Sequence, residues 1–279
     1  MAKATNPAKK YNSNPFTLSF NALERFFKAN LAWAIVILAF GLFGFLFQAT
    51  SSVANNVSEP SGDSSISSSS HSAFSNVDIG IIATVITIAV LFLLIIMVIG
   101  GVIQTFLTGM FSHVINQSEQ GKAVSFSEAF HATTKRFWRL FWASILAQLK
   151  IFGWTLLLII PGIVAALRYS LLPYLIMNES EKEKGVVDSH TKLKAVVKGR
   201  LWEIFGVSTV AAIIPFIGSV VGLAGRGALY RQLQYSYDHK TKRPKIHWLN
   251  YLGLVLLGLL ILFIGFIISI ALVIAIATR

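Results

Sequence analysis

The sequence contains no cysteine and few charged residues. Of its 279 residues, none is Cys and only 13% are Asp, Glu, Lys or Arg, whereas an average soluble domain carries about 25%. The missing thiols exclude disulfides, thiolate metal sites and cysteine nucleophiles. The hydrophobic share of 54% exceeds the roughly 45–50% of soluble domains. The composition therefore excludes a secreted disulfide scaffold, a disordered regulator and an ordinary cytosolic enzyme, and it predicts a membrane protein.

Three apolar runs are long enough to cross a membrane as single helices. They cover residues 30–47, 79–107 and 249–277, and they contain no charged side chain. A hydrocarbon core of about 30 Å requires about 20 helical residues. The second run exceeds this length, so we expect its helix to tilt or to continue beyond the membrane.

Two further apolar segments are interrupted by proline. Residues 140–177 are broken at Pro161-Gly162, and residues 201–235 are divided at Pro215. The limbs of the first segment are just long enough to cross, whereas those of the second have only ~15 to 18 residues. We therefore predict two proline-broken hairpins, of which the second either crosses or is shallow and re-entrant. The predicted fold is an all-α polytopic transmembrane bundle of about six to seven membrane helices, or five full spans if the second hairpin does not cross.

The polar ends and loops complete the predicted organisation. From Pro15 onward, apolar side chains recur every three or four residues, which predicts an amphipathic helix that lies on the membrane surface or packs on the protein's own cytoplasmic loops. Residues 50–78 are rich in serine and cannot bury a core, so we expect a flexible loop. The chain thus divides into a cytoplasmic segment 1–28, a membrane domain 29–248 and an additional transmembrane helix in 249–279.

The distribution of cations predicts the topology. Lys and Arg outnumber Asp and Glu by 24 to 12; they gather in residues 1–28, 108–139, 178–200 and 236–248, and none lies in 50–78. Because loops rich in Lys and Arg stay on the cytoplasmic side, we expect the N-terminus to be cytoplasmic and loop 50–78 to lie outside. Seven crossings then place the C-terminus outside. Anionic membrane lipids, and not nucleic acid, are the expected partners.

Motifs of enzyme chemistry are missing from the sequence. No histidine is spaced with another histidine or a carboxylate as on one face of a spanning helix, and neither a phosphate-binding glycine loop nor a nucleophile elbow is present. The 12 carboxylates lie in loops or near predicted helix ends. We therefore predict no catalytic residue, no metal site and no cofactor.

Two cations interrupt the apolar runs and are the candidate ligand-binding residues. By helical rise, Lys150 and Arg168 are both expected near the bilayer midplane. A charge at that depth is costly and usually faces a bundle interior or a wet cavity. Our hypothesis is that Lys150 and Arg168 line a site for an anionic headgroup or solute. The alternatives are that each side chain extends to an interface, or that residues 140–150 form an in-plane helix outside the core.

Closely spaced glycines predict one close helix contact. Gly218, Gly222 and Gly225 approximate a pattern of small residues four apart, which lets two helix backbones approach. Such a surface serves packing within the chain or between copies, so a homo-oligomer or another membrane-protein partner stays open.

The second half of the chain resembles a known bacterial membrane family. The pattern comprises LLLIIPGIVAALRYSLLPY at 156–174, Ser189, Lys192, Leu193, Lys198-Gly199-Arg200-Leu201-Trp202, FSEAF at 126–130, Lys135-Arg136-Phe137-Trp138 and Ala228-Leu229-Tyr230-Arg231. It resembles the membrane domain associated with glycerophosphoryl diester phosphodiesterases, and a related group of uncharacterised integral membrane proteins, over residues 16–238. The resemblance implies a polytopic helical bundle in the bacterial cytoplasmic (inner) membrane. It does not imply catalysis, because in that family the phosphodiesterase activity belongs to a separate soluble domain.

These observations predict a non-enzymatic integral membrane protein that handles a lipid or small anion or assists another envelope component. A secondary transporter is the first alternative, because broken helices and intramembrane charges recur in transporters. A membrane-embedded lipid-metabolising enzyme is the second alternative, and it would need a nucleophile, base or metal cluster that the sequence does not display.

Overall fold

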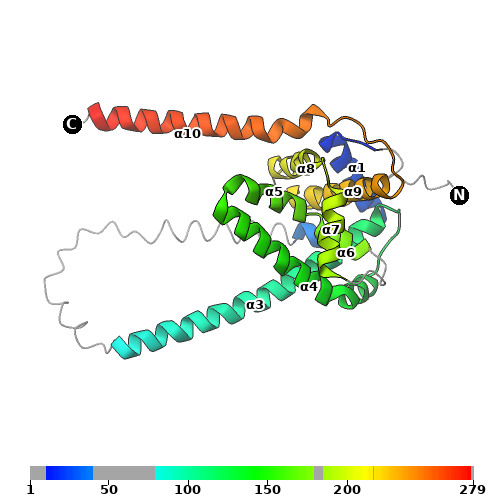
Figure 1. Cartoon of the computed structure of the whole chain (residues 1–279), viewed down its shortest axis with the longest axis horizontal. Helices are drawn as coiled ribbons and strands as arrows, with labels where there is room; N and C mark the ends of the chain where they lie inside the picture. The colour runs from blue at the N-terminus through cyan, green and yellow to red at the C-terminus, as the bar shows by residue number, and fades with distance from the viewer. Residues whose placement is uncertain (1–10, 40–78, 179–184, 216, 278–279) are drawn as a thin grey trace.

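The computed structural model describes residues 11–39, 79–178, 185–215 and 217–277. All regular structure in these ranges is helical, which confirms the predicted all-α class (Figure 1). After helical residues 31–39 in the first predicted span, the rest of that span and the predicted loop 50–78 lie outside the described residues. The elements with full bounds are α1 (Pro15–Ala29), α3 (Ile79–Ser118), α4 (Phe126–Leu157), α5 (Ile159–Tyr169), α6 (Leu172–Asn178), α7 (Val186–Val196), α8 (Leu201–Ile213), α9 (Gly218–Asp238), the 3-10 helix η2 (Trp248–Tyr251) and α10 (Leu252–Ala277).

Two helices begin with side chains that cap their first turns. The Asn14 side-chain oxygen accepts hydrogen bonds from the backbone N–H groups of Phe16 and Thr17, at 3.0 and 3.3 Å, at the start of α1. The Ser125 hydroxyl accepts from the backbone N–H of Glu128 at 3.1 Å at the start of α4. Such caps supply acceptors to N–H groups that have no partner within the helix. They fix where α1 and α4 begin.

Four described helical segments are long and apolar enough to cross a membrane, by length and composition: Ala83–Ser118, Phe126–Leu157, Ile159–Asn178 and Trp248–Ile276. They correspond to the predicted second run, the two limbs of the first hairpin and the last run. Helix α8 has only 13 residues, or ~20 Å of helix, which is too short for a core of ~30 Å. The shallow or re-entrant alternative for the second hairpin is therefore favoured.

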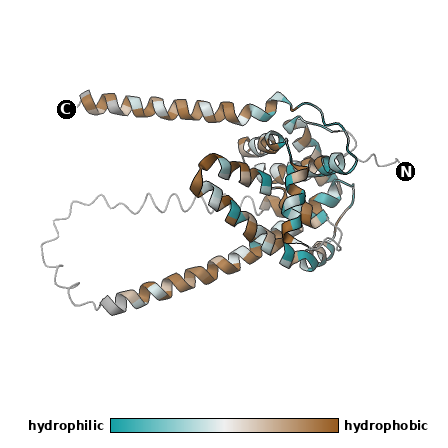
Figure 2. Ribbon diagram, viewed as in Figure 1, coloured by the Kyte–Doolittle hydropathy of each residue, from teal (hydrophilic) through white to brown (hydrophobic). Residues whose placement is uncertain are grey.

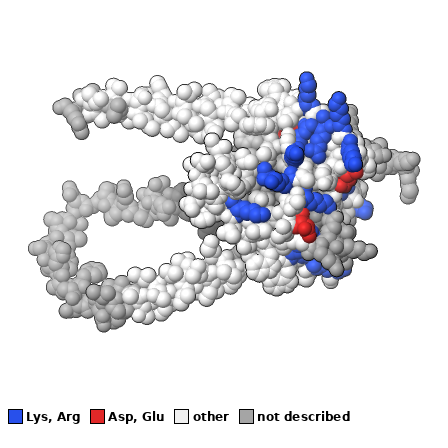
Figure 3. Space-filling view, in the orientation of Figure 1, with Lys and Arg blue, Asp and Glu red and all other residues white. Residues whose placement is uncertain are grey.

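The apolar helices extend from one side of the helical body. Helices α3 and α10 extend from it in the same direction (Figure 1), and Figure 2 shows that their extended parts are hydrophobic. On the face drawn in Figure 3, Lys and Arg gather over the body and are missing from the described extended parts of α3 and α10. Exposed apolar surfaces of this size indicate a membrane contact or a partner. The division between apolar helices and cationic body agrees with the charge asymmetry on which the predicted topology depends.

The break in the first hairpin lies three residues earlier than predicted. Helix α4 ends at Leu157, Leu158 has extended backbone angles (φ −156°, ψ 130°), and α5 begins at Ile159. Pro161 therefore lies inside the first turn of α5. This is a position where proline is tolerated, because the first N–H groups of a helix have no intrahelical acceptor. The proline thus starts the second limb and does not end the first.

The α4–α5 hairpin also reaches less far than α3. The α3 side chains from Ala83 to Ile103 are nearly all exposed, and this stretch is ~32 Å long by helical rise, enough for a full hydrocarbon core. The hairpin tip at Leu158 is ten residues before Arg168, which corresponds to only ~15 Å. Figure 1 shows that the hairpin tip ends much closer to the body than the far ends of α3 and α10. Both limbs are nevertheless long and apolar enough to cross a membrane, so the depth of the hairpin stays a prediction.

The core of the body is built around α9. Its buried side chains include Val220, Ala224, Leu229, Tyr230 and Leu233, and they pack in one cluster with residues of α1, α3, α4, α6, α7 and α8. The rings of Tyr230 and Tyr174 stack with centroids 6.5 Å apart. Although α9 belongs to the second predicted hairpin, it is an interior helix of the body.

The predicted glycine contact lies within the chain. A Cβ atom added at Gly222 would come 2.7 Å from the Ala211 side chain of α8, and one at Gly225 would come 2.8 Å from Val207 of α8. Both distances are too short for a real side chain, so glycine permits the close approach of α8 and α9. The small-residue surface is therefore occupied by the protein's own helix.

Helix α1 packs on the body. Leu18, Ala22 and Phe26 are buried in the core cluster, whereas Phe20 on another face is exposed. Of the two alternatives for this segment, the structure favours packing on the protein's own helices over a helix lying free on the membrane surface. The nearby connection 178–200, predicted to face water, is likewise partly buried, because α7 contributes Leu193 and Val196 to the same core.

Candidate functional site

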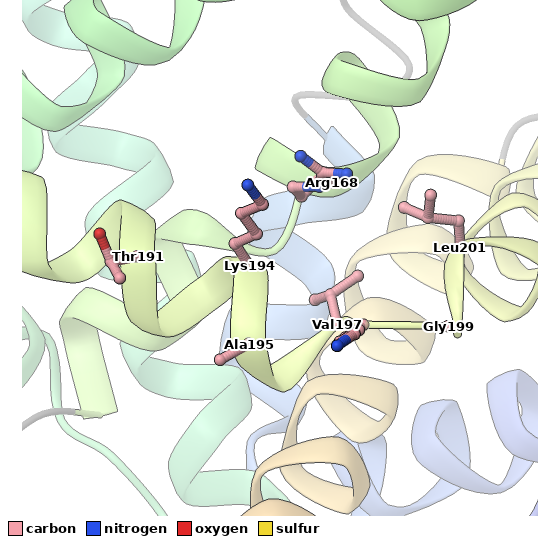
Figure 4. Close-up of a pocket in the computed structure, with 8 residues that line it drawn as sticks. Arg168, Thr191, Lys194, Ala195, Val197, Gly199 and Leu201 are labelled. Carbon is pink, nitrogen blue, oxygen red and sulfur yellow. The ribbon is translucent and has the colours of Figure 1, made fainter.

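A cationic pocket lies where the end of α5 meets the end of α7. Its volume is about 390 Å³, and its lining consists of Arg168, Thr191, Lys194, Ala195, Val197, Lys198, Gly199 and Leu201. Figure 4 shows Arg168 from α5 and Lys194 from α7 at the same opening. The lining contains three cations and no carboxylate. This arrangement suits an anion.

Local helix geometry brings the three cations to the pocket. Arg168 and Lys194 lie in the last turns of α5 and α7, where the backbone carbonyl groups carry partial negative charge and favour cations. Thr191 and Lys194 lie one turn apart on α7 and share one side of that helix, and Lys198 follows in the turn after α7 ends at Val196. Gly199 then reverses the chain with φ 75°, a left-handed conformation that favours glycine.

Within the described ranges, the cations of the pocket have no acidic partner. Among the residues that the structure describes, Arg168, Lys194 and Lys198 form no ion pair. Elsewhere in the body, partly buried cations do have acidic partners: Arg25 pairs with Glu119 at 2.8 Å and Arg200 with Glu203 at 2.9 Å. Uncompensated positive charges that share one opening raise the local potential for an anion.

The structure separates the two cations that the sequence paired. Arg168 lines the pocket, whereas Lys150 is not among its lining residues. The Lys150 ammonium lies over the Tyr169 ring, 5.8 Å from the centroid, a cation–π contact. Tyr169 in turn packs edge to face on His190 of α7, with ring centroids 4.9 Å apart. Lys150 thus belongs to a neighbouring aromatic cluster.

This cluster contains a buried histidine whose pKa is lowered. His190 is buried, and its Nε2 lies 3.1 Å from the backbone oxygen of Ala143. Burial lowers the pKa of His190 below its ordinary value of 6.5, and the Lys150 charge lowers that pKa further. The cluster therefore connects α4, α5 and α7 outside the cationic pocket.

Two lysines of the pocket were not identified as site residues from the sequence. Lys194 and Lys198 lie in the charged stretch 178–200, which predicted only a hydrophilic connection. The available signal was the spacing of Thr191 and Lys194, which places one hydroxyl and one ammonium group on one helical face, whereas Lys198 lies in the turn after α7. The partner that completes the site, Arg168, lies in another predicted element, and only the packing of α7 against α5 connects them.

A buried polar cluster near the N-terminus was also missed. Glu203 of α8 is buried, accepts hydrogen bonds from the hydroxyls of Tyr11 and Ser13, and pairs with Arg200. Burial, followed by the charge of Glu203, raises the pKa of Tyr11. The backbone of Ser13 also accepts a hydrogen bond from the side chain of Asn250 at 2.7 Å. The cluster joins the first described residues, α8 and the residues before α10, and its role is structural.

No group of three His, Asp or Glu side chains that could hold a metal ion occurs among the described residues. Comparisons with known proteins found no match: no family model matches the chain, and neither a curated protein nor a solved structure does.

Proposed function

We propose that this chain is a non-enzymatic integral membrane protein whose Arg168–Lys194–Lys198 pocket binds the phosphate group of an anionic lipid headgroup. The observation that carries the proposal is the convergence of three cations, without a carboxylate, on one opening of about 390 Å³. Phosphate oxygens accept charge-assisted hydrogen bonds from arginine and lysine. The proposal retains Arg168 from the sequence hypothesis and replaces Lys150 by the two lysines of the α7 end.

The expected position of the pocket along the membrane normal supports a lipid as the source of the phosphate. Lys194 and Lys198 are exposed and belong to a strongly charged stretch that is stable only in water or among headgroups. Arg168 lines the same opening, so the pocket lies at the membrane boundary and not at the midplane. A hairpin that projects ~15 Å beyond Arg168 then ends near the centre of a core of ~30 Å.

The helix break does not favour the transporter alternative. In transporters, the unwound backbone of a broken helix lines the substrate cavity. Here the break is at Leu158, whose side chain is 66% exposed at the tip of an apolar hairpin. The break therefore reverses the chain inside the membrane. If the resemblance to the phosphodiesterase-associated membrane domain reflects common ancestry, we propose the same bacterial inner-membrane location, with the cationic body on the cytoplasmic side.

The proposal is tested by titrating the protein in phosphatidylcholine nanodiscs that contain increasing fractions of phosphatidic acid. We expect saturable binding by the wild type and a loss of about tenfold or more for the triple variant Arg168→Gln, Lys194→Gln, Lys198→Gln, because each charged hydrogen bond contributes about 1.5–3 kcal/mol. Lys150→Gln is the matched control and should bind as the wild type does. A separate titration with inorganic phosphate distinguishes a soluble anion from a lipid.

Unchanged lipid binding by the triple variant would refute the pocket. Loss of binding in Lys150→Gln, with Arg168→Gln unaffected, would assign the site to the aromatic cluster instead. Tight binding of inorganic phosphate in lipid-free detergent, without preference for the lipid, would replace the lipid by a small phosphorylated solute.

A further inference from the structure

A second, uncharged cleft lies between three of the candidate spanning segments. Its volume is about 420 Å³, and it is lined by Gln104, Thr105 and Thr108 of α3, Ser144, Ala147, Gln148 and Ile151 of α4, and Ala166, Tyr169, Ser170, Leu172 and Pro173 from α5 to α6. No lining residue is Lys, Arg, His, Asp or Glu. The cleft is therefore chemically different from the cationic pocket, although Arg168 and Tyr169 are consecutive.

The hydroxyl groups of this cleft offer acceptor oxygens. Thr105, Thr108 and Ser170 donate their hydroxyl hydrogens to backbone oxygens of their own helical turns, those of Gly101, Gln104 and Leu167, at 2.7–2.8 Å. A hydroxyl whose hydrogen is already donated in one hydrogen bond can still accept another through its oxygen lone pairs. These oxygens favour a ligand that donates hydrogen bonds.

Two amide side chains add both donors and acceptors. Gln104 and Gln148 are exposed, and neither side-chain amide group is hydrogen-bonded to another described residue. Both lie in apolar helices close to the lipid-facing surface, where an unpaired amide is costly. A ligand that pairs with these amides removes that cost.

The expected depth of the cleft in the membrane and the apolar residues beside it indicate the route by which such a ligand enters. Gln104 follows the exposed stretch of α3 that ends at Ile103, so the cleft lies at the membrane boundary. Its apolar wall includes Ile151, and the neighbouring Leu149 and Phe152 are 64% and 67% exposed. A ligand with an apolar tail can therefore enter from the bilayer and place its head among the polar groups.

We propose that this cleft binds the uncharged, hydroxyl-bearing headgroup of a membrane-soluble amphiphile, such as a monoacylglycerol. Hydroxyl groups donate to the Thr and Ser oxygens and pair with the two amides. A phosphate anion is disfavoured, because its oxygens and the Thr and Ser oxygens of the cleft are all acceptors, and because no cation lines the cleft. This site is independent of the phosphate pocket.

The test uses the full chain in phosphatidylcholine liposomes with a photoactivatable monoacylglycerol, and a photoactivatable phosphatidic acid as the comparison probe. Mass spectrometry of the wild type should map the monoacylglycerol to peptides of α3, α4 or α5 that line the cleft. The variant Thr105→Val, Gln148→Leu should lower that labelling by about tenfold, the effect of losing hydrogen bonds to two uncharged partners. Phosphatidic acid labelling of the cationic pocket should stay unchanged in this variant.

Thr87→Val is the matched control. Thr87 lies on the same helix as Thr105 and also donates to a backbone oxygen one turn earlier, that of Ala83 at 2.8 Å, but it is outside the cleft. It should label as the wild type does. Equal labelling of the wild type and the double variant would overturn the site, as would mapping of the monoacylglycerol elsewhere in the wild type or preferential labelling of the cleft by phosphatidic acid. Because wild-type mapping needs no variant, poor folding of the double variant leaves the proposal testable.

Discussion

The depth of the α4–α5 hairpin is open to direct measurement. The chain contains no cysteine, so one introduced cysteine carries the only thiol label. We place this label at Leu158, the exposed tip of the hairpin. Ten residues of helix separate Leu158 from Arg168, or ~15 Å at ~1.5 Å per residue. With Arg168 at the membrane boundary, the label is expected near the bilayer centre.

Positions on helix α3 serve as depth references within the same protein. Leu94 lies ten residues from Gln104 on the exposed part of α3 and therefore has the same expected depth, ~15 Å from the boundary. Ala83 lies 21 residues from Gln104, or ~32 Å, at the opposite face of a core of ~30 Å. Fluorescent labels at Leu158→Cys and Leu94→Cys should be quenched equally by lipids brominated near the chain ends.

The two possible outcomes differ strongly. A half-depth hairpin keeps the Leu158→Cys label inaccessible to water-soluble quenchers from either side, whereas an Ala83→Cys label is reached from the far side. If the Leu158→Cys label behaves like the Ala83→Cys label, the hairpin crosses fully. Arg168 then lies near the midplane, and the placement of the phosphate pocket among headgroups fails.

Three further perturbations test the body. Glu203→Leu should lower the free energy of unfolding by about 3 kcal/mol, because the Arg200 guanidinium and the hydroxyls of Tyr11 and Ser13 lose their acceptor. The control Glu24→Leu removes an exposed ion pair on a helix and should show no measurable change in thermal unfolding. The lowered pKa of His190 means that the native state binds its proton less readily than the unfolded state, so stability should fall as the pH drops below 6.5 towards the folded-state pKa. His190→Gln should show a smaller fall, and an identical pH profile in the variant would refute the assignment. Gly225→Leu should cost about 1–3 kcal/mol by overpacking α9 against α8, whereas Gly265→Leu on the open surface of α10 should be neutral. Equal effects of these two glycine changes would contradict the packing.

The length of apolar runs is a local property, and it predicted α3 and α10 correctly. The exposed stretch of α3 and the whole of α10 are almost entirely apolar, so their exposed lengths follow from the sequence alone. The reach of the α4–α5 hairpin could not be predicted in this way. Its limbs have enough apolar residues to cross, but part of that apolar surface, such as Leu140 and Ala143, packs inside the body. Apolar composition does not distinguish a lipid-facing residue from a core residue.

The candidate site shows the same division between local and long-range information. Arg168 was identifiable because a cation in an apolar run is unusual and costly. Its partnership with Lys150 was an inference from the similar depth at which helical rise places the two residues. Lys150 faces the Tyr169 ring, and Arg168 lines the pocket with the lysines of α7. Residues that follow one another on a helix point about 100° apart, so depth alone could not select the partner.

A hairpin that ends at half depth explains why two different polar openings occur on either side of one turn. In the proposed arrangement, the exposed apolar tip around Leu158 enters the bilayer and the charged body stays among the headgroups, which would hold the end of α5 at the membrane boundary. There Arg168 faces the cationic pocket and Tyr169 the uncharged cleft. Lipid headgroups at this height present a phosphate, hydroxyl groups or both, and α5 offers each chemistry on a separate side. Substitutions at the tip should therefore weaken both kinds of binding together, whereas substitutions inside one opening should affect only that opening.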